Sequence, residues 1–98
     1  MPYIDKFMRM ELDPKIDDLV GSLFLPHDKE LDTSNPGNLN YVITKLIIAW
    51  LGGRPNYARY NEVIGVLECV KQELYRRKMA VYEDEKCREN GDVYPTIG

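Results

Sequence analysis

Histidine and cysteine are scarce in this sequence, and their scarcity argues against several kinds of chemistry. His27 is the single histidine, and no companion for catalysis or metal binding stands near it in the chain. Cys69 and Cys87 are the two cysteines, and on one predicted helix they would lie roughly 27 Å apart. They are too far apart to form a disulfide within one chain. We therefore expect free thiols, no metal site, no cofactor and no catalytic residue.

A long apolar run is also missing. The longest one, residues 46–51, is far shorter than the roughly 20 residues that span a bilayer. The first residues lack the basic and then apolar layout of a secretion signal. Free thiols suit a reducing compartment. Together these features predict a cytoplasmic protein without membrane contact.

Positive charge is in short supply over the whole chain but not in its middle. The net charge is −3, which argues against bulk binding to nucleic acid or anionic membranes. Residues 54–78 carry six basic and three acidic side chains, whereas residues 79–98 carry two basic and five acidic ones. The middle of the chain is thus a positive segment between two acidic ends, and such segments can attract each other within one chain or between copies.

Apolar residues recur at steps of three and four, which predicts an all-α protein forming one small helical domain over residues 1–98. Helices are expected over residues 13–25, where Asp13 and Pro14 make a favourable start, over 38–51, and over 57–89. The β-branched residues of the second segment would also suit a strand, but the period of its apolar residues favours a helix. The segments outside the helices are expected to be a short N-terminal arm (1–12), a flexible loop (26–38) and an extended tail (92–98).

The third predicted helix carries an apolar seam with steps of four and three. At about 1.5 Å per residue this helix would be roughly 50 Å long, which exceeds what a small globule needs. We therefore expect either a break near residues 76–78 or burial of the far half against another copy, in a dimer or higher oligomer. The residues of the predicted interface are Val63, Leu67, Val70, Leu74 and Val81.

Aromatic, basic and amide side chains are interleaved in the positive segment. Aromatic rings can stack on a base, guanidinium groups can bind phosphate, and amides can read a base edge. This combination predicts a site for a nucleotide-like small molecule or a host component, in a protein that is not an enzyme. The predicted ligand-binding residues are Arg54, Tyr57, Arg59, Tyr60, Asn61, Arg76 and Arg77.

Two other functions remain open from the sequence. The chain could be a purely structural protein–protein interaction module that uses the third helix and the tail. It could also be a small magnesium-dependent nucleotide hydrolase, although carboxylates three residues apart, which could share one cation, are missing from the predicted helices. Glu62, Glu68 and Glu73 are spaced by six and five residues and point in different directions.

Four segments of the chain resemble a family of proteins of about this length whose function is unknown. The segments are NYVITKL (40–46), YNEVIGVLECVKQELYRR (60–77), YEDEK (82–86) and ENGDVY (89–94). We associate this family with phages, prophages and some prokaryotes. The resemblance implies a viral accessory protein, which would act in the host cytoplasm, and it transfers no catalytic residue.

Overall fold

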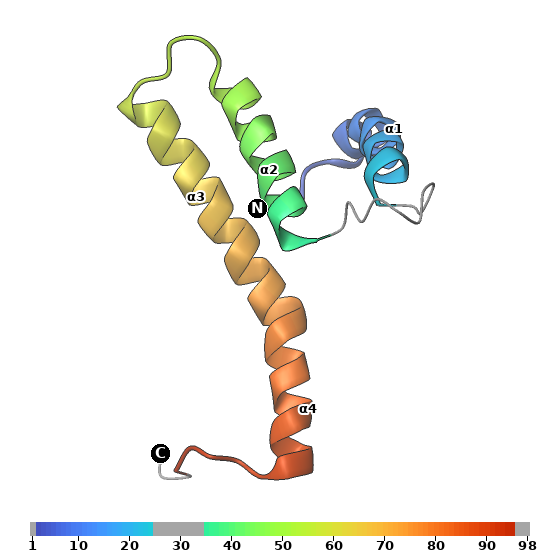
Figure 1. The fold of residues 1–98 in the computed structure, drawn as a ribbon, viewed down its shortest axis with the longest axis vertical. Helices are drawn as coiled ribbons and strands as arrows, with labels where there is room; N and C mark the ends of the chain where they lie inside the picture. The colour runs from blue at the N-terminus through green and yellow to red at the C-terminus, as the bar shows by residue number, and fades with distance from the viewer. Residues whose placement is uncertain (1, 25–34, 96–98) are drawn as a thin grey trace. The chain divides into compact units, whose positions relative to one another are not determined.

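The computed structural model describes residues 2–24 and 35–95, and most of these residues are helical, with no strand among them (Figure 1). The all-α fold and the three main helices predicted from the sequence are confirmed. The chain divides into two compact units, residues 2–61 and the residues from 62 onward. The helices are α1 (Lys6–Leu23), α2 (Pro36–Leu51), α3 (Tyr57–Leu74), the π-helical segment η1 (Tyr75–Met79) and α4 (Ala80–Asn90).

Helix α1 begins at Lys6, so the predicted start at residue 13 and the predicted arm over 1–12 are wrong. The cap is Asp5, whose carboxylate accepts a hydrogen bond of 2.9 Å from the backbone N–H of Met8. The first turns after this cap consist of strong helix formers such as lysine, methionine and leucine. Pro14 therefore lies inside the helix, where it removes one backbone hydrogen bond without ending it.

Helix α2 begins at Pro36, two residues before the predicted start. Asn35 is its cap and accepts a hydrogen bond of 2.9 Å from the N–H of Asn38. Proline fits the first helical position because its missing N–H would have no helical partner there. The predicted loop over 26–38 is thus too long at its C-terminal end, and its residues 26–34 lie outside the described part of the chain. The predicted end at Gly52 is confirmed: its φ of 76° is a conformation that glycine adopts without strain.

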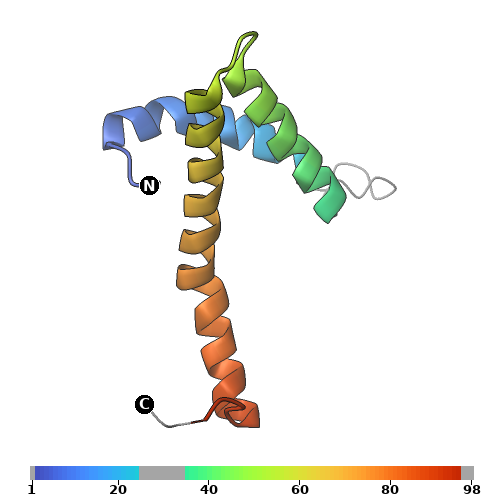
Figure 2. The same cartoon turned by 90° about the vertical axis from the view of Figure 1, so that its left-hand side faces the viewer.

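Helices α3, η1 and α4 form one long helix of 34 residues, as the spacing of its apolar residues predicts. The break expected near residues 76–78 takes the form of one wide turn. The N–H of Ala80 donates to the carbonyl of Tyr75, five residues back instead of four. The helix axis changes direction at this segment, as both views show (Figures 1 and 2). Gly91, with a φ of 91°, ends the helix.

The tail is described as far as Pro95. It leaves the helix in an irregular conformation, and the N–H of Tyr94 donates to the Asp92 carboxylate over 2.9 Å. Val93 and Tyr94 are 91% and 78% exposed. The last three residues of the predicted tail lie outside the described part of the chain.

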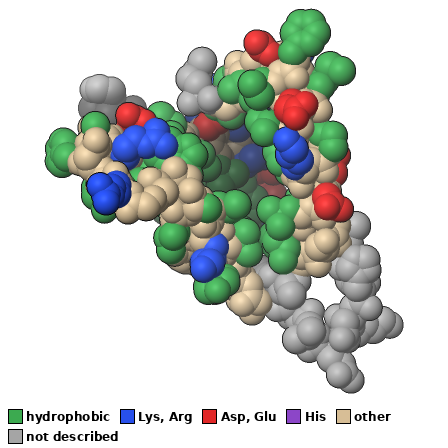
Figure 3. Space-filling view, turned by 90° about the horizontal axis from the view of Figure 1, so that it is seen from above, with side chains coloured by type: hydrophobic (Ala, Val, Ile, Leu, Met, Phe, Trp, Pro, Cys, Tyr) green, Lys and Arg blue, Asp and Glu red, His purple; other side chains and the backbone are tan. Residues whose placement is uncertain are grey.

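Large apolar side chains are exposed along every helix. Of the residues that the structure describes, none is buried, whether apolar or polar. The space-filling view accordingly shows hydrophobic side chains among charged ones on the surface (Figure 3). Burial of apolar area is the main favourable contribution to folding. These helical faces therefore lack the contact that normally stabilises such residues.

Gly65 lies on the face of the long helix opposite to the apolar seam. A substitution there tests directly whether this face is free of contact with another chain. It lies inside α3, and a Cβ added to it would meet no atom within 4 Å. We expect Gly65→Ala to raise the free energy of unfolding by about 1 kcal/mol, because alanine has the higher helix propensity. Thermal unfolding followed by circular dichroism measures this change. A loss of stability would show that another chain packs closely against the backbone at this position.

Candidate protein-interaction surface

The apolar seam of the long helix is built by four residues of α3. Val63 is half-buried, whereas Leu67, Val70 and Leu74 are 40%, 59% and 61% exposed. Their steps of four, three and four residues place them on one face of the helix. The seam therefore presents a line of aliphatic side chains that could receive the apolar face of another helix.

The wide turn of η1 changes which residues continue the seam. A turn closed over five residues holds one residue more than an α-turn, so the residues after it move by about 100° around the axis. Val81, predicted to share the seam, is carried about a quarter of a turn away from it. Tyr82, which is 56% exposed, continues the line of Leu67 and Leu74 instead. Sequence periodicity could not show this, because counting residues assumes a uniform helix.

Two polar interactions hold the helix around its wide turn. The Tyr75 hydroxyl donates to a carboxylate oxygen of Glu83 over 3.1 Å, and this contact joins η1 to α4. The same carboxylate raises the pKa of Tyr75, because it stabilises the protonated phenol. On the other side of the turn, Arg76 binds both carboxylate oxygens of Glu73 at 2.9 and 3.1 Å. The helix is thus braced on both sides of the irregular hydrogen bond.

Glu68 lies on the polar side of α3 and pairs with its own helical neighbours. It accepts a hydrogen bond from Gln72 and forms an ion pair with Lys71 at 3.2 Å. These contacts lower the pKa of Glu68, with the Gln72 hydrogen bond as the largest cause. All three side chains are exposed to water, so these pairs stabilise the helix only weakly.

Five of the predicted ligand residues, Arg54, Tyr57, Arg59, Tyr60 and Asn61, lie where α2 turns into α3. Arg59 is already engaged: its guanidinium lies 3.5 Å from the centre of the Trp50 ring and donates to the Trp50 carbonyl over 3.3 Å. The backbone N–H of the same residue donates to the Asn56 side chain, which caps α3.

Trp50 was missed as a partner in this turn. The available signal was a tryptophan in the last turn of one helix and an arginine in the first turn of the next. Of the other predicted residues at this turn, Tyr57 is 82% exposed and Tyr60 is 47% exposed, while Arg54 and Asn61 are also exposed.

Arg76 and Arg77 are the two remaining predicted ligand residues, and they lie in η1. They follow Tyr60 by sixteen and seventeen residues on the same helix, or about 24 Å at the rise of an α-helix. One copy of the chain therefore does not bring all seven residues together along this helix. Arg76 is bound to Glu73, and the i, i+4 pairing of Glu73 with Arg77 that helical spacing favours is not formed.

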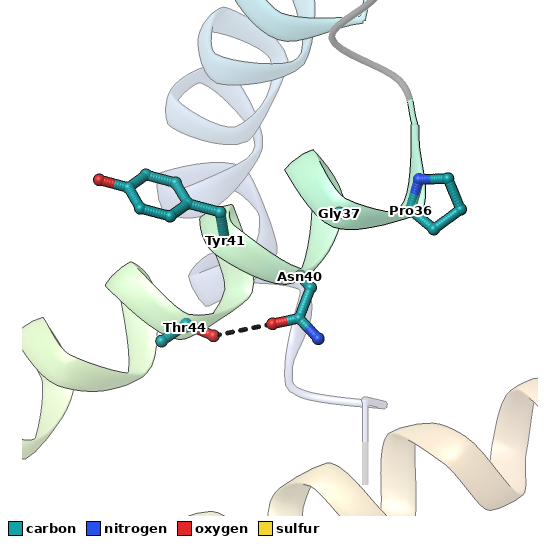
Figure 4. A pocket seen from close by; sticks show the side chains of 5 residues that line it. All are labelled: Pro36, Gly37, Asn40, Tyr41 and Thr44. Atoms are coloured by element: carbon teal, nitrogen blue, oxygen red, sulfur yellow. Dashed lines mark hydrogen bonds between the residues drawn. The ribbon is translucent and has the colours of Figure 1, made fainter.

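The described residues also form two shallow hollows. One lies on a single face of α2 and is lined by Pro36, Gly37, Asn40, Tyr41 and Thr44, with the Thr44 hydroxyl donating to Asn40 over 3.1 Å (Figure 4). The other lies between α4 and the tail, from Glu83 to Tyr94, where partial burial and then Asp92 raise the pKa of the Cys87 thiol. Neither hollow contains a predicted ligand residue.

Within residues 2–24 and 35–95, no three histidine, cysteine or acidic side chains come together as metal ligands. Over those two ranges, every helix is too short or too polar to span a bilayer. Both cysteines are free thiols. His27 lies outside the described part of the chain.

The fold and the exposed seam define the class: a small all-α protein whose apolar helical faces are open to contact. The chain belongs to the family described as domain of unknown function DUF6899, whose model matches residues 1–93. This confirms the resemblance to an uncharacterised family seen in the sequence. No curated protein and no solved structure matches the chain.

The contact between Arg59 and Trp50 yields a prediction for the turn between α2 and α3. We expect Arg59→Gln to lower the free energy of unfolding by about 1 kcal/mol, through loss of the cation–π contact and the bond to the Trp50 carbonyl. Because Trp50 is the single tryptophan, its emission spectrum reports the loss directly. Arg54→Gln is the matched control, and it should leave the emission unchanged. An unchanged spectrum in both variants would contradict the contact.

Proposed function

We propose that this protein is not an enzyme and that it works by assembling with other protein chains, copies of itself first among them. One observation supports this most strongly: no described residue is buried, although every helix carries large apolar side chains. Monomeric proteins rarely leave extended apolar faces in water, and such faces commonly mark protein interfaces. Burial of one leucine or valine contributes about 1.5–3 kcal/mol. A partner chain is the contact that would supply this burial.

The proposed assembly makes the stability of the protein dependent on its concentration. Sedimentation velocity over a wide range of concentrations should show an oligomer that dissociates on dilution. The melting temperature should rise with concentration, because association stabilises the folded chain by mass action. A monomer at every concentration, with a constant melting temperature, would contradict self-assembly. In that case a protein partner captured by the seam would be sought instead.

A nucleotide-like ligand is a second proposal, and it is favoured by two exposed residues: Arg54 in the turn before α3 and the Tyr57 ring at the start of this helix, three residues later. The ring offers a stacking surface, and the arginine offers a phosphate-binding group. Thermal shift against a panel of mononucleotides and cyclic nucleotides tests it. The ligand proposal fails if none of them stabilises the protein, whereas magnesium-dependent release of phosphate or pyrophosphate would favour a hydrolase.

The setting of this function is also a proposal. We propose a cytoplasmic viral accessory protein that holds a component of the host cell. Two free thiols and the resemblance to proteins of phages and prophages support this setting. Gentle purification followed by native mass spectrometry would report both the subunit number and any retained molecule. A bare oligomer would favour the structural role, and a stoichiometric extra mass would favour sequestration of a ligand.

A further inference from the structure

Val81 is the centre of a small surface patch on η1 and α4 that has two halves of opposite charge. Its side chain is 51% exposed. In α4, residues three and four positions away share a face, so Asp84 and Glu85 lie on the same face as Val81, one turn after it. Arg77 and Lys78 of η1 lie about one turn before Val81, and all four charged residues are exposed.

The four charged side chains of this Val81 patch have no side-chain partner among the described residues. None of the four forms a side-chain hydrogen bond or an ion pair within residues 2–24 and 35–95. Arg77 has one carboxylate at helical spacing, Glu73, and Arg76 already binds it. Lys78 has no carboxylate three or four residues away. The two halves of the patch lie about two turns apart, so they are not helical neighbours of each other.

From this pattern we propose that two copies of the chain pair antiparallel across Val81. In that arrangement Arg77 and Lys78 of each copy face Asp84 and Glu85 of the other, and the two-fold axis passes beside Val81. A two-fold contact uses the same patch on both chains, so each favourable charge pair occurs twice. Parallel copies in register would place like charges together. The antiparallel pair is therefore the arrangement that the charges of this patch select.

A second copy fits this patch better than a different partner does. A purely acidic or purely basic partner would match one half of the patch and oppose the other half. Val81 and the acidic half of the patch lie about a quarter of a turn from the seam of Val63, Leu67, Val70 and Leu74, whereas the basic half follows Leu74 directly and borders the seam. This inference rests on the proposed self-assembly and names the partner and its orientation. Charge pairs at an exposed surface are screened by salt, so the pairing should weaken as ionic strength rises.

Charge reversal gives the decisive experiment. Arg77→Glu with Lys78→Glu makes the patch wholly acidic, and Asp84→Lys with Glu85→Lys makes it wholly basic. We expect each double variant alone to associate about a hundred-fold more weakly than the wild type. An equimolar mixture of the two should restore association as a one-to-one hybrid, which native mass spectrometry resolves by mass. Variants that associate like the wild type, or a mixture that forms no hybrid, would overturn the proposal.

A disulfide trap tests the position of the axis. In a chain carrying Cys69→Ser and Cys87→Ser, the change Val81→Cys should give a cross-linked dimer on mild oxidation. Glu83→Cys, an exposed neighbour on the opposite side of the helix and away from the seam, is the matched control and should cross-link about tenfold more slowly, because it lies off the proposed axis. Equal rates at the two positions would overturn the antiparallel register.

These results separate this inference from the proposed function. Assembly that survives both charge reversals, with equal cross-linking rates, would overturn the Val81 pairing and leave self-assembly through the seam standing. A wild-type chain that stays monomeric at low salt and high concentration would overturn both. A hybrid of the two charge variants, together with rapid Val81→Cys cross-linking, would establish the antiparallel pair.

Discussion

Replacing Leu67 and Leu74 together by aspartate is expected to abolish association through the seam and to leave at most the antiparallel pair across Val81. Both side chains lie exposed on the seam, where the proposed partner chain would cover them. Each substitution removes an apolar contact and places a carboxylate where it would lose its water. A loss of about 3 kcal/mol corresponds to roughly a hundred-fold weaker association, and two such changes should abolish it.

Sedimentation velocity measures the loss, and circular dichroism checks that the helices remain. Cys69→Asp is a suitable control because Cys69 is exposed and lies two residues from Leu67, on the opposite side of the helix. The control should assemble like the wild type. If the double variant sediments like the wild type, the seam is not the interface, and the apolar faces of α1 and α2 become the next candidates.

Replacing Pro14 by alanine is expected to stabilise helix α1 strongly. Pro14 lies in the helix interior, where it cannot donate the backbone hydrogen bond that any other residue would make. A proline at such a position costs about 3 kcal/mol relative to alanine. Pro14→Ala should therefore increase the helical signal in circular dichroism and raise the melting temperature of the transition that includes α1.

Pro36→Ala is the matched control for this prediction. Pro36 occupies the first turn of α2, where a missing N–H costs nothing, so its replacement should change stability by no more than a few tenths of a kcal/mol. An equal effect of the two substitutions would mean that position within the helix does not matter. No gain from Pro14→Ala would contradict a helix that runs through this proline.

The ends of the helices show which features can be predicted from the residues close to them in the sequence and which cannot. The helices predicted over 38–51 and 57–89 end in the structure at residues 51 and 90, and the residues that follow, Gly52 and Gly91, both adopt a positive φ that favours glycine. The cap of α1 was placed eight residues too late, at Asp13, because Asp13 followed by Pro14 has the same local features as a true cap. Asp5 is the cap in the structure. Two candidate caps in one segment cannot be ranked without knowing which residues between them are helical.

Some features of the candidate surfaces could likewise be predicted from the sequence, and others could not. The residues of α3 that form the seam follow from spacing alone, because a regular helix places steps of three and four on one face. The line of the seam beyond Leu74 does not follow, since η1 inserts one wide turn that periodicity cannot reveal. The engagement of Arg59 by Trp50 was also missed, because it depends on how the chain turns between two helices.

The sequence by itself determined the all-α class, the length of the final helix and most helix ends, because hydrogen bonding within a helix and its caps depends on residues only a few positions apart. It also determined which side chains of α3 form the apolar seam and which residues form the basic segment. Only the tertiary structure decided that Val81 leaves the seam, that Arg59 and Arg76 already have partners, and that the side chains of Arg77 and Lys78 have none among the residues that the structure describes. These outcomes depend on the wide turn and on contacts between side chains, whose geometry residue spacing does not specify.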